Sequence, residues 1–527
     1  MAEYDAIVIG SGNNGLAAAN VLVKEHLKVL VLEKNKYVGG GGATVELFKG
    51  FRHDIAAVML FSMSQRIVED LELERYGLEV IDAPVLSCSI SSLGEKPLVH
   101  YSDETQMMKQ LLEYGGEDAV LGLAALSEFA QTVGEAIDRW HAPLPGPPKS
   151  VIAIINEAPN LEIKDRMRRL LLGSAMDVIK EFFPDPNKHR MLTYQLAFLA
   201  GLEIFRSPTE PGTGLHLIWS LALDDYSRKH YLRQIKGGMG MIMEGLRRRL
   251  EEKGGEVRLS SRVKRILVEN GKAIGVELEK GEKITAKVIL SNLDAYATFI
   301  ALVGESNLSS DFAHVVKGID YRCPYLNILL TLKELPKFAG DLAFLNDLKV
   351  PSFFIVDSPE HVVQCWEACK RGRIPQDPHA SVRITSVYDN SVAPPGYHTA
   401  NIFSSHFPIT TPKEQQGRLK DEMAERIIDK LNKYAPNFRD AIIDKAVFAP
   451  MHYESMFGWT NGDYMHGALH LEQMLNFRPV VGWSPGYKTP VENLYLCGSA
   501  CHPGPGVSFI PGYNSAHEVL KNWERKK

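Results

Sequence analysis

A glycine-rich turn near the start of the chain lies inside a strand–turn–helix–strand pattern. Residues 6–9 are apolar and β-branched, which predicts a buried strand, and they run directly into the turn Gly-Ser-Gly-Asn-Asn-Gly of residues 10–15. Residues 16–25 are rich in alanine and leucine and predict a helix. A second apolar strand is predicted over residues 28–32, and it ends at Glu33. This order of elements predicts an α/β unit that binds a dinucleotide.

Each glycine of this turn has a separate predicted role. Gly10 permits the tight turn, Gly12 lets the backbone approach a pyrophosphate, and Gly15 lets the helix pack closely on the strand. The N-terminus of the helix offers free N–H groups and the positive end of its dipole to the phosphates. Glu33 follows the turn at the distance where a carboxylate holds a ribose hydroxyl and disfavours a 2′-phosphate. NADP is therefore a poor fit, whereas FAD and NAD both fit.

The composition excludes several other classes of protein. The chain has 527 residues, of which 45% are hydrophobic and 23% charged, and these values are typical of a folded chain with two domains or one large insertion. Lys and Arg number 59 against 64 Asp and Glu, so nucleic acid is not expected as a partner. No apolar run reaches the length of about 18 residues that predicts a membrane-spanning helix. Peripheral contact with a membrane stays open.

The cysteines form no metal or redox motif. The six cysteines are Cys88, Cys323, Cys365, Cys369, Cys497 and Cys501. None belongs to a C-x-x-C pair, and Cys365 with Cys369 has no second pair of ligands nearby, so we expect no metal site. Sparse cysteines suit a reducing compartment, and no charged-then-apolar leader is visible. We therefore expect a cytoplasmic protein, free or peripheral on a membrane.

A second glycine-rich loop follows the acidic residue. Residues 39–42 are four consecutive glycines, and they let the backbone approach a cofactor again. With the E-K-N-K-Y-V-G-G run from Glu33 and the G-F-R-H-D run at residues 50–54, this loop resembles the start of the phytoene desaturase-like flavoproteins, within the wider amine-oxidase-like FAD superfamily. The resemblance implies FAD as the cofactor. This family often has an arginine directly after two glycines, and Gly41 stands at that position here.

The C-terminal region carries a second resemblance to the same family. Residues 493–507 read N-L-Y-L-C-G-S-A-C-H-P-G-P-G-V and match the family's closing segment in identity and spacing. The resemblance implies that Gly498 and Val507 contact the ribityl–phosphate arm and the flavin. Pro505 and Phe509 depart from the family pattern and leave the shape of the site at the flavin ring open.

Residues 457–473 resemble one branch of the family in particular. That branch holds the pyridine nucleotide-disulfide oxidoreductase domain-containing protein 2 group and is related to the carotenoid ketolases. A disulfide reductase would need a redox cysteine pair near its N-terminus and a second nucleotide fingerprint, and this sequence has neither. The resemblance runs from about residue 4 to residue 522 and is strongest at the two ends.

The fold class follows from these segments. A G-G-M-G run at residues 237–240 precedes a predicted helix, residues 256–278 predict hairpin-like strands, and residues 286–292 predict a further buried strand. We predict an α/β fold with a FAD-binding Rossmann-like domain of the amine-oxidase and phytoene-desaturase type, and a second, mixed α+β substrate-binding domain with a helical lid. The first domain is assigned residues 1–100, 231–304 and 470–527, and the second is assigned residues 101–230 and 305–469.

The second domain carries its own predicted elements. Strands are predicted over residues 326–332 and 382–387, and helices over residues 360–371 and 412–434. A basic cluster lies in the helical region, at Lys164, Arg166, Arg168 and Arg169. We interpret it as a solvated helix face, with a membrane-facing helix as the alternative.

The candidate site residues come from the motifs and from the resemblance. In the family, a valine at the position of Val263 meets the adenine through its backbone. The candidate cofactor-binding residues are Gly10, Gly12, Asn14, Gly15, Glu33, Lys34, Gly40, Gly41, Gly42, Ala43, Thr44, Val263, Asn292, Gly498, Val507 and Ser508. His502 and His466 are the candidate catalytic residues, because they lie in the two C-terminal motifs and histidine can move a proton near neutral pH.

The predicted function is that of a FAD-dependent oxidoreductase of the desaturase or dehydrogenase kind. Hydride would pass from an apolar substrate, isoprenoid or acyl in character, to flavin N5, with oxygen or a quinone as the electron acceptor. A redox-neutral double-bond isomerase is the first alternative, and a flavin-bearing binding protein with a blocked cavity is the second. The sequence leaves the substrate, the acceptor and homo-oligomer formation open.

Overall fold

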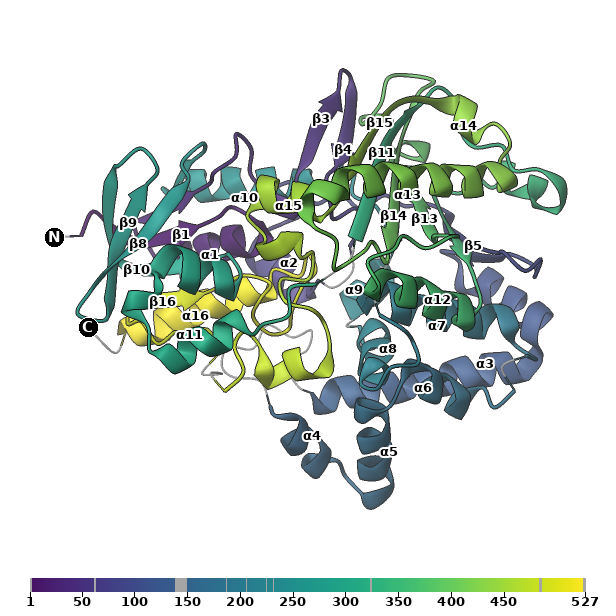
Figure 1. Cartoon of the computed structure of the whole chain (residues 1–527), viewed down its shortest axis with the longest axis horizontal. Helices are drawn as coiled ribbons and strands as arrows, with labels where there is room; N and C mark the ends of the chain where they lie inside the picture. Colours follow the sequence, from purple (N-terminus) through teal and green to yellow (C-terminus); the bar gives the residue numbers. More distant parts are fainter. Residues whose placement is uncertain are drawn as a thin grey trace.

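A computed structural model describes the fold of residues 2–524 apart from residues 61–62, 138–148, 186, 205, 224, 231, 323–324 and 483–485. Cys323 therefore lies outside the described residues. Two large sheets form two lobes of the molecule, and a group of helices lies below the second sheet (Figure 1). The described N-terminal and C-terminal segments both belong to the first lobe.

The first sheet has parallel strands at its centre. Its strand order is β7 (Glu256–Arg258), β2 (Val29–Leu32), β1 (Tyr4–Ile9), β10 (Lys283–Ser291), β9 (Lys272–Leu278) and β8 (Val263–Glu269), and β16 (Leu494–Leu496) also pairs with β10. The pairs β7–β2, β2–β1, β1–β10 and β10–β16 are all parallel. The central strands β1 and β2 are buried on both faces, which explains their nearly continuous apolar sequences.

Helices cover one face of the first sheet. They are α1 (Asn13–Lys24), α10 (Gly240–Glu252) and α16 (Ile510–Glu524). Side chains of β1, such as Val8, share a core with these helices, whereas Ile7 and Ile9 share a second core with β8, β9 and α11 (Ser310–Lys317). The predicted Rossmann-like unit is confirmed, and three widely separated segments of the chain build it.

The second sheet is mixed. Its order is β15 (Ile442–Phe448), β11 (Tyr325–Leu332), β14 (His398–Ser405), β13 (Ala380–Arg383), β12 (Ser352–Val356), β5 (Val85–Ser91) and β6 (Leu98–Tyr101). One face packs against the long helix α13 (Lys413–Tyr434) in an apolar core. The other face turns toward the helices α7 (Arg190–Ile204) and α8 (Thr213–Leu221) and toward the first lobe.

The sheet pairing changes two details of the sequence prediction. Residues up to 100 were assigned to the first domain, but β5 and β6 belong to the second sheet, where β5 runs parallel to β12. The alternate side chains Cys88 and Ile90 of β5 are buried in the core of that sheet. The strand predicted over residues 382–387 ends at Arg383, because its partner β12 begins opposite that residue, and a 3₁₀ turn follows at Thr385–Val387.

The helical region fills most of residues 104–230. Its elements are α3 (Glu104–Ala136), α4 (Val151–Glu157), α5 (Leu161–Leu172), α6 (Ala175–Phe182), α7, α8 and α9 (Asp225–His230). Arg166 and Arg169 pair with Glu181, and Arg168 pairs with Asp165, so three members of the basic cluster are already in ion pairs. Within the part of the chain that the structure describes, no helix is long and apolar enough to cross a bilayer.

One hairpin and several helices complete the described elements. The hairpin β3 (Thr44–Phe48) and β4 (Phe51–Asp54) leads out of the second glycine loop, and α2 (Gln65–Asp70) follows it. The helices α12 (Pro359–Lys370) and α14 (Phe438–Ala441) lie in the second lobe, whereas α15 (Pro450–Phe457) also contacts the first, where Lys34 donates to the carbonyl of Ser455.

Two buried asparagines fasten the second sheet to the segment after the hairpin. Asn327 of β11 donates its side-chain N–H to the carbonyl of Ile55 at 2.9 Å, and Asn401 of β14 donates to the carbonyl of Asp54 at 2.7 Å. Both asparagines are buried. Because a buried carbonyl without a donor is costly, these bonds fix where the first lobe's chain meets the second sheet.

We expect Asn401→Ala to lower the free energy of unfolding by about 1–3 kcal/mol, since it leaves the buried carbonyl of Asp54 without this donor. Urea unfolding followed by circular dichroism measures the change. Asn522→Ala serves as a control, because Asn522 is only partly buried and donates to the carbonyl of Glu518 in its own helix α16. An Asn401 variant as stable as the control would contradict the proposed role of this bond.

Candidate functional site

The principal cavity of the described structure begins at the first glycine turn. Gly10, Gly12 and Asn13 line it where β1 ends and α1 begins, and Asn292 joins them from the end of the neighbouring strand β10. The carboxyl ends of parallel strands meet at this edge of the sheet, which is where α/β folds bind nucleotides. Gly12 is the N-cap residue of α1 and provides no side-chain cap, so the first backbone N–H groups of this helix are available to a ligand at its N-terminus.

Glu33 is buried and lines the same cavity at the end of β2. Its Oε2 accepts hydrogen bonds from the N–H and the hydroxyl of Ser11 at 3.0 and 2.7 Å, and its Oε1 accepts one from the N–H of Asn35 at 2.8 Å. These donors hold the carboxylate in place, and its remaining lone pairs suit ribose hydroxyls. Ser11 and Asn35 were not among the predicted site residues, although Ser11 lies within the first glycine turn and Asn35 two residues after Glu33.

At two glycines of the first turn, Gly12 and Gly15, an added side chain would collide with neighbouring atoms. A β-carbon on Gly15 would lie 2.1 Å from the carbonyl oxygen of Gly10, and one on Gly12 would lie 2.8 Å from Nδ2 of Asn292. A side chain at Gly15 would require the backbone to move, whereas one at Gly12 would require the side chain of Asn292 to shift. Backbone atoms and the side-chain amide of Asn292 therefore pack closely around the turn and form a cradle, which fits a pyrophosphate.

The second glycine loop forms the next part of the wall. Gly40, Gly41 and Gly42 form a 3₁₀ turn and line the cavity. A β-carbon on Gly41 would lie 2.8 Å from the ring of Trp459, which occupies the space beside the loop. The arginine that the family often has at this position cannot be accommodated here, and Trp459 is the physical reason.

The C-terminal motif forms a further part of the cavity wall, next to the first glycine turn. Ser499, Pro505 and Val507 line the wall. Two asparagines of the glycine turn attach this segment to α1: Asn14 donates to the hydroxyl of Ser499 at 3.0 Å, and Asn13 donates to the carbonyl of Gly506 at 3.3 Å.

Several predicted cofactor residues lie behind the wall. These are Asn14, Gly15, Lys34, Ala43, Thr44, Val263, Gly498 and Ser508, none of which lines the described cavity. Lys34 donates to the carbonyl of Ser455, and Thr44 accepts from the N–H of Gly240 at 2.7 Å. Val263 is buried at the start of β8. Their direct contact with FAD stays a prediction, and the structure gives Asn14, Gly15 and Thr44 supporting contacts.

The two candidate histidines lie in different surroundings. His466 lines the cavity, and its ring meets that of Trp459 edge to face at 4.9 Å between centroids. Burial lowers the pKa of His466 to about 3, so it is neutral at physiological pH. His502 is buried outside the described lining, and its backbone carbonyl accepts from the hydroxyl of Tyr487. The catalytic roles of both histidines remain predictions.

Arg478 is a buried residue that the sequence analysis did not single out. Its guanidinium donates to the carbonyl of Met465 at 2.9 Å and to that of Ala500 at 3.0 Å, and thereby joins the loop of His466 to the C-terminal motif. Burial lowers the pKa of Arg478 to about 10. Because guanidinium donors satisfy several loop carbonyls at once, this residue sets the spacing of the two motifs.

Beyond the glycine loops, the cavity is walled by aromatic rings. Tyr325 of β11 stacks on Tyr464 at 4.6 Å and on Phe403 of β14 at 5.4 Å, and all three line the cavity. Trp219 of α8 and Phe457 of α15 add two more rings to the lining. The second sheet and its helices thus provide an apolar chamber that continues from the predicted cofactor site.

The comparisons with known proteins agree with this geometry. Residues 15–518 match the family of flavin containing amine oxidoreductases, and the chain belongs to that family. It is 28% identical to pyridine nucleotide-disulfide oxidoreductase domain-containing protein 2 of Rattus norvegicus, over 99% of this chain and 94% of the rat protein. It is 26% identical to the chloroplastic prolycopene isomerase of Daucus carota, over 98% of this chain and 80% of that protein. It is 23% identical to the phytoene desaturase of Neurospora crassa, over 96% of this chain and 82% of that protein.

Solved structures share the fold at low sequence identity. An oxidoreductase from Methanosarcina mazei superposes with a TM-score of 0.62 at 17% identity, over 98% of this chain and 100% of that one. Cyclohexylamine oxidase from Brevibacterium oxydans superposes with a TM-score of 0.59 at 14% identity, over 99% of this chain and 100% of that one. The predicted resemblance to phytoene desaturase-like FAD oxidoreductases is confirmed, and the chain is a FAD-dependent oxidoreductase.

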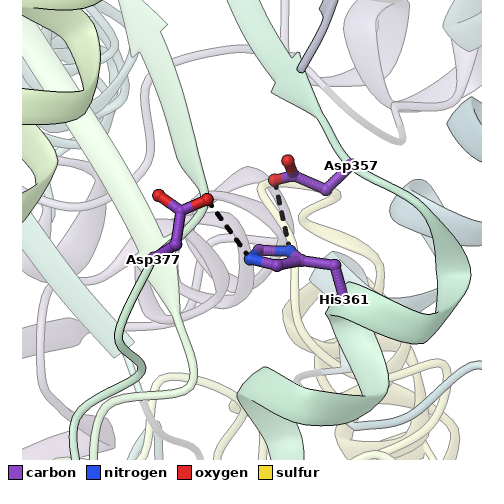
Figure 2. A group of neighbouring side chains, drawn as sticks. All are labelled: Asp357, His361 and Asp377. Carbon is purple, nitrogen blue, oxygen red and sulfur yellow. Dashed lines mark ion pairs between the residues drawn. The ribbon is translucent and has the colours of Figure 1, made fainter. Parts of the chain in front are cut away.

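A second cluster of chemically active side chains lies in the second lobe, away from the described lining of the cavity. Figure 2 shows His361 of α12 between Asp357 and Asp377, at 3.3 and 3.5 Å. The three side chains are close enough to share a metal ion. However, Nζ of Lys430 lies 2.9 Å from Asp357 and 3.1 Å from Asp377. This ammonium is already paired with both carboxylates, so we interpret the cluster as a partly buried ion-pair network.

The network predicts a pH-dependent contribution to stability. Burial alone would lower the pKa of His361, but its bond to Asp377 and the nearby Cys365 and Asp357 raise it to about 10. A histidine whose pKa rises on folding stabilises the fold fully below its unfolded pKa of about 6.5, and that stabilisation is lost as the pH rises through about 10.

We therefore expect His361→Gln to reduce the free energy of unfolding by about 1–3 kcal/mol at acidic to neutral pH, and by progressively less toward the folded pKa. Urea unfolding across this pH range measures the difference. His314→Gln, on the exposed surface of α11, is the matched control. A difference that does not change with pH would show that His361 is uncharged.

The glycine cradle gives a direct test of the cofactor position. We expect Gly12→Val to be purified without FAD, because its side chain would fill the space between the turn and Asn292 that the pyrophosphate needs. Flavin absorbance relative to protein absorbance measures the occupancy, and circular dichroism reports whether the variant folds. Gly417→Val in α13, where a β-carbon meets nothing within 4 Å, is the control. Full FAD content in a folded Gly12→Val variant would place the cofactor elsewhere.

Proposed function

We propose that this FAD-dependent oxidoreductase removes a hydride from one carbon of a largely apolar substrate, while a proton is lost from the neighbouring carbon to solvent, so that a double bond forms between the two carbons. The observation that supports the proposal is the continuity of one cavity, from the glycine turns of the first sheet to the aromatic chamber of the second. A polyene, isoprenoid or acyl chain would be held beside the flavin by this chamber. The relatives named for prolycopene isomerisation and phytoene desaturation support a substrate with carbon–carbon double bonds.

FAD supplies a two-electron acceptor when it is bound. The chain's own residues hold the substrate and exclude water. Among the described residues of the cavity wall, the carboxylates of Glu33 and Asp294 are engaged by several donors, with Asp294 accepting from the N–H and the hydroxyl of Thr460. His466 is neutral and packed against Trp459. This wall suits removal of a hydride without a strong protein base.

The redox-neutral isomerase is the second candidate. The similarity to prolycopene isomerase favours it, and the same apolar chamber would hold a polyene whose double bonds shift. The third hypothesis, a binding protein with a blocked cavity, loses its motivation: Phe509 is buried in the core of the first lobe, and Pro505 lines an open cavity. Oxygen or a quinone stays our proposal for the acceptor, as do a cytoplasmic location and peripheral contact with a membrane.

We expect the flavin of the purified holoenzyme to lose its visible absorbance when a lipid extract from the source cells is added without oxygen, since a substrate would transfer its hydride. Mass spectrometry of the consumed lipid then shows a product lighter by two hydrogen atoms. A product of unchanged mass would assign the isomerase instead. An extract that neither bleaches the flavin nor changes in composition would contradict both candidates.

A further inference from the structure

Trp459 borders both the second glycine loop and the aromatic chamber. It follows α15, and it lines the cavity together with Gly40, Gly41 and Gly42. Its ring also lies edge to face with that of Tyr464, at 5.8 Å between centroids, and Tyr464 in turn stacks on Tyr325 of the second sheet. The indole therefore joins the glycine wall of the cavity to its aromatic wall.

The indole is also the reason why residue 41 is a glycine. A β-carbon at position 41 would lie 2.8 Å from both Cζ2 and Cη2 of Trp459, so a side chain there would require the indole to move. The next neighbour, Cβ of Ala56, would be at 3.7 Å, which is an ordinary contact. Gly39 and Gly40 have positive φ angles, but Gly41 does not, so its backbone would accept another residue. Residues 41 and 459 are therefore a matched pair, in which the ring takes the space of a side chain.

Neighbouring rings restrict the movement of the indole. Phe457 lies 4.9 Å from it, Tyr453 lies at 5.5 Å with its plane tilted by 25°, and His466 meets it edge to face at 4.9 Å between centroids. Tyr453 and Phe457 are buried side chains of α15. Because aromatic contacts of these geometries are favourable beyond the burial of area, they fix the position of the indole.

A buried aspartate of the first lobe holds the next residue along the chain. Asp294 follows β10 and accepts hydrogen bonds from the N–H of Thr460 at 2.9 Å and from its hydroxyl at 2.8 Å. It also accepts one from the N–H of Ala297 at 2.8 Å, which orients the carboxylate. These bonds join the end of a strand of the first sheet to the segment that carries Trp459, and they set the distance of the indole from the cofactor cradle.

The matched pair changes the chemical character of this wall. The family often has an arginine where Gly41 stands, and a guanidinium would bring a positive charge to the second glycine loop. The indole is neutral, and so is His466 beside it, because burial lowers the pKa of His466 to about 3. An indole offers dispersion and stacking contacts to another ring instead of a charge.

We propose that the indole of Trp459 packs against the isoalloxazine ring of FAD, in the place of the arginine of the family. With the pyrophosphate at Gly12 and the ribose at Glu33, the flavin half of FAD continues along the cavity beyond the first turn. The second glycine loop lies directly beside that turn, since the N–H of Gly39 donates to the carbonyl of Ser11 at 2.9 Å. The inference concerns the cofactor alone and does not rest on the hydride transfer proposed above.

Fluorescence of the bound flavin tests this contact, because an indole in contact with an isoalloxazine ring quenches its emission by electron transfer. We expect Trp459→Phe to retain FAD and to emit severalfold more strongly per bound flavin than the wild type. Trp523→Phe is the matched control and should emit like the wild type, because Trp523 lies near the end of α16 and outside the described lining of the cavity. Unchanged emission from FAD-loaded Trp459→Phe would overturn the proposal.

A paired substitution decides the matter if Trp459→Phe does not retain FAD. Gly41→Arg alone should lose most of its FAD, because the new side chain collides with the indole. Gly41→Arg combined with Trp459→Ala should regain FAD, since the arginine then has the space of the ring. Flavin absorbance relative to protein absorbance measures the FAD content, and circular dichroism reports folding. A folded double variant with no more FAD than Gly41→Arg alone would overturn the matched pair. Both measurements are made without a substrate, so their outcome is independent of the lipid experiment.

Discussion

The close packing of backbone against backbone at the first glycine turn is the constraint on which the rest of the structure depends. Gly15 lies so near the carbonyl of Gly10 that no β-carbon fits between them. This approach seats α1 directly on the first sheet and points its N-terminus at the cavity. It also lets Asn13 and Asn14 reach the C-terminal motif, which the chain supplies almost five hundred residues later. A substitution here would therefore disturb the cradle and the C-terminal part of the cavity wall together.

The second lobe is positioned relative to this cradle by buried polar groups. Asn327 and Asn401 hold the segment after β4, and Arg478 holds the loop of His466 against the C-terminal motif. Buried hydrogen bonds of this kind fix geometry because their loss leaves unsatisfied groups. The result is one cavity with two kinds of wall: glycine backbone and carboxylates on the first sheet, and aromatic rings with one arginine on the second. The wall of glycine backbone and carboxylates suits a flavin cofactor, and the wall of aromatic rings suits an elongated substrate.

The sequence predicted the parts of the structure that short motifs encode. The turn at residues 10–15, the acid at Glu33 and the buried parallel strands all follow from local spacing and strand burial. The role of β5 could not be predicted in this way, because its partner β12 is distant in the chain. Arg383 was missed for the same reason, because only the packing of the two lobes brings it to the cavity. Trp459 lies in the segment 457–473 that the family resemblance singled out, but nothing in that segment shows that its ring lies beside the second glycine loop. The opposite happened with His502. Its motif predicted a position near the flavin, but His502 is not among the residues that line the described cavity.

The central claim is that FAD and the substrate share one cavity, with the flavin between the second glycine loop and the aromatic rings. A crystal structure of the FAD-loaded protein is the most direct measurement of this claim. We expect the pyrophosphate at Gly12, the ribose at Glu33 and the flavin ring beside Gly41 and Trp459, with the chamber next to Tyr325 left for the substrate. A flavin ring seated against Arg383, filling the chamber, would contradict the account and leave no place for an apolar substrate.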